Sequence, residues 1–284
     1  MTHNSAKFMN YIGFLTLLLT SFPVMAAESA WAQADFLKVR LLTAQSTMGN
    51  SGNGPASVQA ALEIVMEPGW HIYWRMPGDG GLPPDLDWTA SQNLKEAVIG
   101  WPAPRRFEYE GLYGFGYKDS ALLPVTLTPE TSGEAMALSV QADIMVCKDL
   151  CVPQALSFSL TLPAGTGEKD AQAVTVEKAF ASLPPQENQP DIRIDNVVLG
   201  PKAIVVQAYL AQGFEGADLF VEAGSDLYLL APPVITPDDK DSRSASLVLA
   251  APDGVDNLAQ AIMGKSLTLT LVKDDRTLER RFDF

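Results

Sequence analysis

The stretch ALSVQADIMVCKDLCVPQALSFSLTLP, residues 137–163, determines the fold class of its region. Apolar and polar residues alternate in ALSVQADIMV, residues 137–146, and again in ALSFSLTLP, residues 155–163. Such alternation is typical of strands that bury one face and expose the other. The segment between them contains Pro153, which cannot donate a hydrogen bond in the centre of a sheet. We therefore predict two strands, one ending at 146 and the other beginning at 155, that are joined as a hairpin.

This connection holds both cysteines of the chain, Cys147 and Cys151. In an extended strand, residues four apart are separated by roughly 13 Å. That separation exceeds the roughly 4.4 to 6.8 Å between Cα atoms that a disulfide tolerates. Either the pair is unbridged or CKDLC folds into a turn, and the flanking strands favour the turn. The cysteines would then lie at the mouth of a hairpin, where a partner can reach them.

The residues alone leave three interpretations of the cysteine pair open. A disulfide that closes five residues stabilises by only about 2 kcal/mol, and a chain that is 47% hydrophobic can form cores without it. The pair can still be a modest structural disulfide. It can also be redox-active, since Lys148 favours a neighbouring thiolate although Asp149 opposes it. In the third interpretation the thiolates and Met145 bind Cu(I), which prefers such soft ligands.

The rest of the chain extends the β pattern. Alternating segments in the first half are KVRLLTA, SVQAALEIVM and ALLPVTLT, and those in the second half are DIRIDNVVL, AIVVQAYL, ADLFVEA, LYLLAPP, SASLVLAA and KSLTLTLV. Short alternating strands at regular spacing favour antiparallel sandwiches. We predict an all-β chain with two β-sandwich domains, at residues 35–165 and 191–284. Residues 166–190 are predicted to form a short helix and a proline-rich linker, and a second short helix is expected to begin at an Asp256 cap.

The first residues predict export. Lys7 precedes an apolar run, residues 11–19, and small residues follow at 24–26, which is the pattern of a secretory signal peptide over residues 1–26. The apolar run is too short to span a bilayer, which takes roughly 20 residues, and no other segment is apolar enough. We therefore expect no membrane insertion. A net charge of −14 also makes nucleic acids and anionic lipid surfaces poor partners.

Most catalytic constellations are excluded by the residue inventory. Once the signal peptide is removed, His71 is the one remaining histidine, so no multi-histidine metal site can form. The segment GDGGLP has no helix after it to hold phosphates. In WHIYW, residues 70–74, we expect Trp70, Ile72 and Trp74 to share a buried strand face, with His71 on the other face.

Three blocks in this order resemble a known family: WHIYWRMPGDGGLPPDLDW, WPAPRRFEYEGLYGFGYKDSALLPV and VCKDLCVPQ. They resemble the periplasmic N-terminal domain of the DsbD/ScsB family of thiol:disulfide interchange proteins, over roughly residues 37–163. The second β-unit resembles the extra sandwich of the longer, ScsB-like members. The resemblance implies immunoglobulin-like sandwiches.

The resemblance also implies a redox site. Cys147 and Cys151 would be the redox pair, with Cys151 forming the mixed disulfide with partners and Cys147 resolving it. An aromatic cap loop, FEYEGLYGF, would cover the pair. The residues expected to form this cap and shape the site are Phe107, Glu110, Leu112, Tyr113 and Phe115. Aromatic core packing around a glycine-rich loop is the alternative interpretation of this segment.

The implied function is electron relay in the periplasm, from a membrane thiol reductase to oxidised periplasmic proteins, with thioredoxin-like proteins as partners. No cofactor and no metal are expected, because the cysteines themselves carry the electrons. Full-length members add a membrane domain and a thioredoxin domain that this sequence does not contain, so the protein is expected either to work with separately encoded partners or to have lost the relay role. Their cysteines are also spaced further apart. The alternatives are a protein-binding module with a structural disulfide and a Cu(I)-handling protein.

Overall fold

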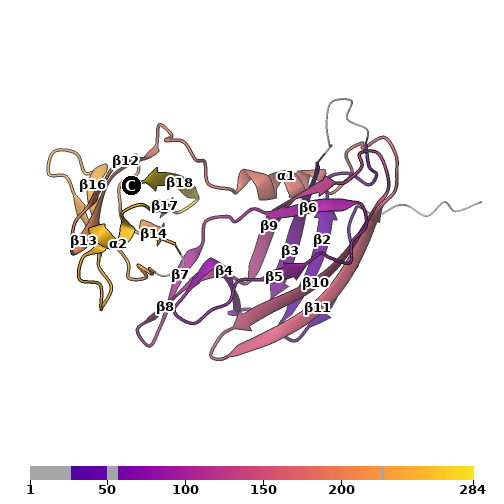
Figure 1. The fold of residues 1–284 in the computed structure, drawn as a ribbon, viewed down its shortest axis with the longest axis horizontal. Coiled ribbons are helices and arrows are strands. Elements are labelled where there is room, and N and C mark those ends of the chain that lie inside the picture. Colours follow the sequence, from indigo (N-terminus) through magenta and orange to yellow (C-terminus); the bar gives the residue numbers. More distant parts are fainter. Residues whose placement is uncertain (1–26, 50–56, 225–226) are drawn as a thin grey trace, which may run out of the picture.

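The computed structural model describes residues 27–49, 57–224 and 227–284, and it shows two β-sandwiches joined by a short helix (Figure 1). The signal peptide predicted at 1–26 lies outside the described residues. The predicted fold class, two immunoglobulin-like antiparallel β-sandwiches, is confirmed.

The first sandwich packs two antiparallel sheets face to face. One has the order β1 (Ala32–Ala34), β2 (Leu37–Thr43), β3 (Val58–Met66), β9 (Ser120–Pro129), β6 (Leu94–Ile99). The other has the order β11 (Cys151–Leu162), β10 (Met136–Cys147), β4 (His71–Gly78), β8 (Leu112–Lys118), β7 (Arg105–Tyr109), and β5 (Asp85–Asp87) also pairs with β10. Alternate side chains of β10 and β11 enter the core between the sheets, including Val140 and Phe158, as their sequence pattern predicts.

The two strands of the cysteine hairpin are longer than predicted. They pair from Met136↔Leu162 to Cys147↔Cys151, so the predicted ends at 146 and 155 are wrong. Pro153 lies within β11, opposite Met145. It is tolerated there because β11 is the edge strand of its sheet, where one side of the backbone needs no partner.

The second sandwich has its own apolar core between a larger and a smaller sheet. The larger sheet has the order β12 (Ile192–Leu199), β13 (Ala203–Leu210), β16 (Ser244–Ala250), β15 (Val234–Pro237), and the smaller has the order β14 (Asp218–Glu222), β17 (Ser266–Lys273), β18 (Arg276–Asp283). Helix α2 (Leu258–Ile262) is capped by Asn257, whose side-chain oxygen accepts from the Gln260 N–H. The predicted cap at Asp256 is thus displaced by one residue.

The segment between the sandwiches belongs structurally to the first. Helix α1 (Ala173–Ala181) buries Val176 and Ala179 against the outer face of the first sheet, where Leu42 and Ala61 lie. At the other end, β1 pairs with β2 although it precedes residue 35. The first sandwich and its attached elements therefore extend beyond the range 35–165 on both sides.

An apolar cluster joins the two sandwiches. Trp74 and Phe115 of the first sandwich are fully buried and pack edge-to-face on Phe220 of the second, with ring centroids 6.1 and 5.0 Å apart. Trp70, Ile72 and Trp74 are all buried as predicted, but Trp74 belongs to this cluster and not to the core that contains the other two. Pairing of β4 with β8 is irregular after Tyr73, and this irregularity changes the direction in which the next side chains point.

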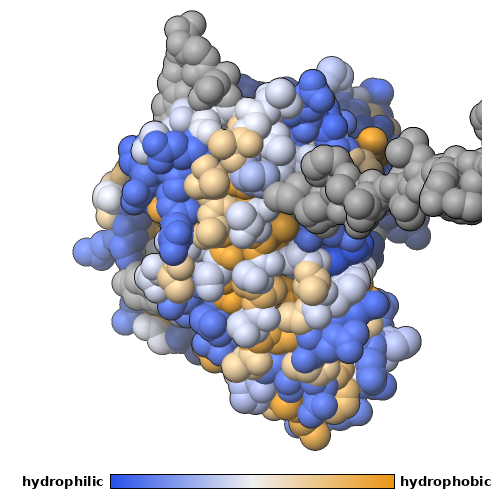
Figure 2. Space-filling model, turned by 90° about the vertical axis from the view of Figure 1, so that its right-hand side faces the viewer, coloured by the Kyte–Doolittle hydropathy of each residue, from blue (hydrophilic) through white to orange (hydrophobic). Residues whose placement is uncertain are grey.

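The opposite end of the first sandwich is not covered by the second. Figure 2 shows this end, where apolar residues form a broken band between hydrophilic flanks.

Among the described residues, no helix is both long and apolar enough to cross a membrane.

Candidate functional site

The cysteines form a disulfide at the end of the β10–β11 hairpin, with Cα atoms 4.1 Å apart. They are direct register partners, and the turn between them is closed by the Lys148 N–H, which donates to the Leu150 carbonyl at 3.1 Å. The two residues differ in exposure: Cys147 is 2% exposed, whereas Cys151 lies at the surface. A second molecule can therefore approach the bond from the Cys151 side.

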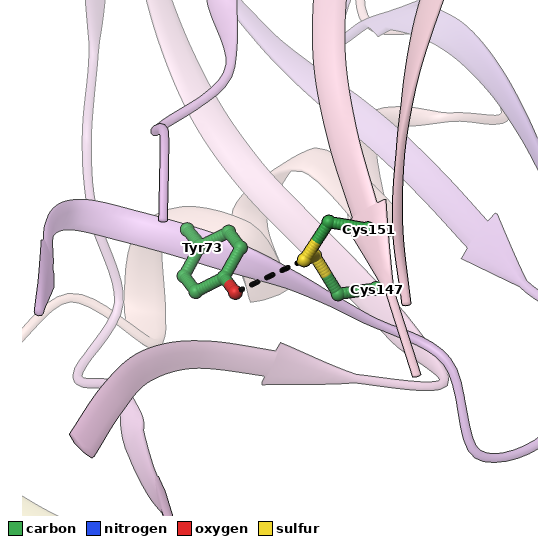
Figure 3. The surroundings of a disulfide bond; sticks show 3 residues. All are labelled: Tyr73, Cys147 and Cys151. Atoms are coloured by element: carbon green, nitrogen blue, oxygen red, sulfur yellow. Dashed lines mark hydrogen bonds between the residues drawn. A yellow bond between two sulfur atoms is a disulfide. The ribbon is translucent and has the colours of Figure 1, made fainter. Parts of the chain in front are cut away.

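Strand β4 brings two ring side chains to the disulfide. His71 pairs with Cys147 in the sheet, and the Tyr73 hydroxyl lies 3.7 Å from the Cys151 Sγ (Figure 3). Because a disulfide sulfur carries no hydrogen, the hydroxyl is the donor. Gly81 packs on the Tyr73 ring so closely that a Cβ there would lie 2.2 Å from a ring carbon. This glycine thus leaves the space in which the ring reaches the sulfur.

Burial shifts the pKa values of both rings. It raises the pKa of Tyr73 above 10.0, so the phenol stays protonated and remains a hydrogen-bond donor at neutral pH. Burial also lowers the pKa of His71 below 6.5, and the charge of Lys118 lowers it further. His71 is accordingly neutral at pH 7. Its ring centroid lies 4.5 Å from that of Phe107.

The β7–β8 hairpin forms the other wall of the site. Its tip is a two-residue turn in which Glu110 and Gly111 both have positive φ, 51° and 82°, as the tightest hairpin turns require. A cavity of about 240 Å³ lies between this hairpin, β4 and the disulfide. The residues around it include Phe107, Tyr109, Leu112, Tyr113 and both cysteines.

The structure separates the five predicted cap residues. Phe107, Leu112 and Tyr113 border the cavity with the disulfide, whereas Glu110 occupies the exposed turn and does not line it. Phe115 lies elsewhere, fully buried against the second sandwich. The reason is the register of the hairpin: Phe115 pairs with Arg106, so it lies on the opposite face from Phe107, which pairs with Gly114.

Sequence reasoning did not include Tyr73 or His71 among the site residues, although it expected His71 on the strand face opposite Ile72, where the structure places it. A signal was present in WHIYW, since His71 and Tyr73 alternate with Ile72 and so share the face directed away from the main core. What the sequence did not show is that this face meets the cysteine hairpin. That contact arises from the pairing of β4 with β10, which are far apart in the chain.

Large exposed apolar side chains gather around the disulfide. Tyr109, Leu112 and Leu150 border the cavity and are 59, 57 and 62% exposed. A second hollow, of about 700 Å³, lies along the adjoining part of the β10–β11 hairpin, between Leu82 and Pro153. Apolar surface of this kind is typical of protein-binding sites.

For metal binding, the described residues place no group of ligands around the cysteines. In residues 27–49, 57–224 and 227–284, no group of three or more His, Cys, Asp and Glu side chains is placed to hold a metal ion. Met145, the third ligand in the Cu(I) interpretation, lines the hollow beside the hairpin rather than the cavity that contains the cysteines.

Fold and site together define an immunoglobulin-like sandwich that carries a disulfide at a surface hairpin. Residues 38–163 match the family model described as thiol:disulfide interchange protein DsbD, N-terminal. This part of the chain is therefore a domain of that family, and the resemblance seen in the three sequence blocks is confirmed. Residues 182–284 match a domain of unknown function (DUF8393).

Solved structures extend the comparison to both sandwiches. The chain is similar to the N-terminal periplasmic domain of ScsB from Proteus mirabilis, with a TM-score of 0.68 and 21% identity, over 91% of this chain and 98% of that chain. At this identity the likeness establishes the fold alone. A marsupial T cell receptor aligns with a TM-score of 0.23 and 8% identity, over 88% of this chain and 98% of that chain, and supports no argument. A comparison with curated proteins gives no match.

Proposed function

We propose that this protein is a periplasmic thiol-disulfide exchange protein that relays electrons through Cys147 and Cys151. The donor would be a membrane thiol reductase with a thioredoxin-like partner, and the acceptors would be oxidised periplasmic proteins. The observation that carries the proposal is the position of the disulfide: it lies at a surface hairpin with Cys151 exposed, in a domain of the interchange family.

The exchange takes place in two steps each way. In the reduced pair, the Cys151 thiolate attacks one sulfur of a client disulfide, forms a mixed disulfide and releases one client thiolate. The Cys147 thiolate then attacks the Cys151 sulfur, which restores the Cys147–Cys151 bond and releases the second client thiolate. Two electrons pass to the client, and a donor dithiol restores the reduced pair by the reverse steps. No cofactor is required, because the sulfur atoms carry the electrons.

The exposure of the two cysteines supports these roles. The incoming sulfur must approach in line with the bond it breaks, so the exposed Cys151 is the better attacking and attacked residue. Cys147 is almost completely buried and can meet only the sulfur beside it. Tyr73 would stabilise the Cys151 thiolate by donating its hydroxyl hydrogen, as it does to the sulfur of the closed disulfide.

The apolar surroundings support docking of a protein rather than a small thiol. Leu112 and Leu150 expose more than half of their surface beside the pair, and a partner would bury them. Contacts of this kind hold two sulfur atoms together long enough for exchange without adding a charge preference.

A trapping experiment tests the roles of the two cysteines. Cys147→Ser leaves Cys151 free to attack, and without the resolving thiol its mixed disulfides with periplasmic proteins should accumulate. Cys151→Ser should trap none, because Cys147 is buried, and this variant serves as the matched control. Accumulation of adducts in neither variant, or mainly in Cys151→Ser, would contradict the proposal.

The reduction potential separates a relay from a structural disulfide. Equilibration with thiol buffers should place the Cys147–Cys151 pair above about −300 mV, the limit below which structural disulfides are found. A value below that limit would instead favour a protein-binding module with a structural disulfide.

A further inference from the structure

The two faces of the β7–β8 hairpin contact different parts of the molecule. Phe107 and Leu112 face the cavity with the disulfide, whereas Arg106 and Phe115 face the second sandwich. Figure 1 shows the hairpin lying between the second sandwich and the rest of the first. A structural link therefore exists between the domain of unknown function and the wall of the proposed redox site.

The sheet of the first sandwich pairs with one strand of this hairpin, β8, and only as far as Gly114. Pairing of β8 with β4 is regular from His71↔Lys118 to Tyr73↔Gly116, and the next pair is Gly78↔Gly114. Strand β7 pairs with β8 and is the last strand of the sheet. Strand β7 and the tip beyond Gly114 are thus paired only within the hairpin, like an isolated two-stranded ribbon, which is at best marginally stable in water.

Two further attachments hold the hairpin, one on β8 near the tip and one on β7. On one side the Asp79 carboxylate accepts from the Tyr113 N–H at 2.7 Å, and the Asp79 N–H donates to the Tyr113 carbonyl at 2.8 Å. On the other side the guanidinium of Arg106 reaches the second sandwich. Its Nε and Nη2 donate to the two carboxylate oxygens of Asp218 at 2.9 and 2.8 Å.

Arg106 makes its contacts with the second sandwich almost out of water. Its side chain is 10% exposed, and it also donates to the carbonyls of Leu219, at 3.2 Å, and Leu230. The guanidinium lies 4.8 Å from the ring of Phe115 and 5.0 Å from that of Phe220. Bidentate, largely buried pairs of this kind are among the stronger polar contacts in proteins.

We propose that the second sandwich is a brace that fixes the β7–β8 hairpin beside the disulfide, and that Arg106 is the positioning residue through which it acts. The inference depends on the proposed function only in that a second molecule must reach the sulfur atoms. Without the brace, the hairpin tip moves away from the cavity more often, and the disulfide becomes easier to reach.

The experiment weakens the contact between the hairpin and the second sandwich by changing a residue on either side of it. Arg106→Ala removes all contacts of the guanidinium with the second sandwich, and Asp218→Asn removes the charge of its carboxylate partner. Arg106→Lys keeps the positive charge without the bidentate geometry. Arg40→Ala is the matched control, because Arg40 of β2 likewise forms part-buried ion pairs, with Glu28 and with Glu63 of β3, but lies in the other sheet. Two readouts are taken on the full chain: amide hydrogen exchange of residues 107–115, and the rate at which a water-soluble phosphine reduces the disulfide.

Arg106→Ala should speed both hydrogen exchange and reduction by about ten-fold, the order expected when hydrogen bonds to a charged group are lost. Asp218→Asn and Arg106→Lys should give smaller increases, and Arg40→Ala should give none. Unchanged rates in Arg106→Ala would overturn the inference. An effect of Arg106→Ala without any effect of Asp218→Asn would also overturn it, since the arginine would then act within the hairpin. The phosphine needs no client, so the result does not depend on the relay.

Discussion

At the scale of single residues, the site depends on two rings of β4 that differ in what they offer the sulfur atoms. Tyr73 offers a hydrogen-bond donor that stays protonated because burial raises its pKa. His71 pairs with Cys147 in the sheet and is neutral at pH 7, because burial lowers its pKa. Each ring gives rise to a separate prediction.

Tyr73→Phe should weaken the nucleophile. Loss of the hydroxyl removes a hydrogen bond to the Cys151 thiolate, so the pKa of that thiol should rise by about one unit. The measurement is the pH dependence of alkylation of Cys151 in a Cys147→Ser background. Tyr117→Phe, which removes a hydroxyl bonded to the Pro102 carbonyl instead, is the control and should leave the thiol pKa unchanged.

His71 should make stability depend on pH. The pKa of His71 is lower in the folded protein than its unfolded value of 6.5, so the unfolded chain takes up the proton first as the pH falls. Stability from this residue is complete above about pH 6.5 and is lost as the pH falls towards the folded pKa. Between about pH 7.5 and about pH 5.5, the Tm of thermal unfolding should decrease less for His71→Gln than for the unmodified protein, because the variant has no imidazole to protonate. An identical decrease in both proteins would contradict this assignment.

At the scale of elements, the cysteine hairpin carries the site without depending on its disulfide. Strands β10 and β11 pair over their whole length, and Val140, Ile144 and Leu160 anchor them in the core. The turn at residues 148–150 is therefore held by the strands on either side. This arrangement allows the bond to open and close while the fold persists.

Reduction of the disulfide should cost little stability. The closed loop has five residues, so the chain-entropy account gives about 2 kcal/mol for the free energy of unfolding. Urea unfolding of the oxidised and reduced protein gives the difference directly. A loss of more than about 5 kcal/mol would mean that the disulfide supports the sandwich itself.

Two strand ends in this hairpin could not be predicted from the sequence. Pro153 argues for a loop if its strand is central, and the sequence does not show which strand is at the edge. The structure places β11 at the edge, so the strand continues through the proline to Cys151. The alternating pattern predicted the strands themselves correctly, because it depends only on which face is buried.

At the scale of the whole molecule, two cores are joined by a mixed apolar and ionic interface. Arg75 of β4 contacts Glu222 at 2.6 Å and Glu279 at 2.5 Å, beside the cluster of Trp74, Phe115 and Phe220. Each sandwich also has a separate apolar core. Unfolding of one domain should therefore destabilise the other, by an amount that depends on the contacts in this interface.

Arg75→Ala should reduce that coupling. It removes the cation that separates two carboxylates, so interface stability should fall by about 1 to 3 kcal/mol. In calorimetry we expect a larger difference between the unfolding temperatures of the two sandwiches in this variant than in the unmodified protein. Arg193→Ala, which removes an exposed pair with Asp195 within the second sandwich, should leave the transitions where they are.

The β class, the two sandwiches and the cysteine pair can be read from the sequence, because alternation and residue chemistry are local properties of the chain. The side chains that meet the sulfur atoms are set by the tertiary structure. Tyr73 lies at Cys151 through strand pairing across more than seventy residues, and Phe115 turns to the second sandwich through the register of its hairpin. Pairing partners and register are set by the packing of the whole fold, so no local pattern in the chain specifies them.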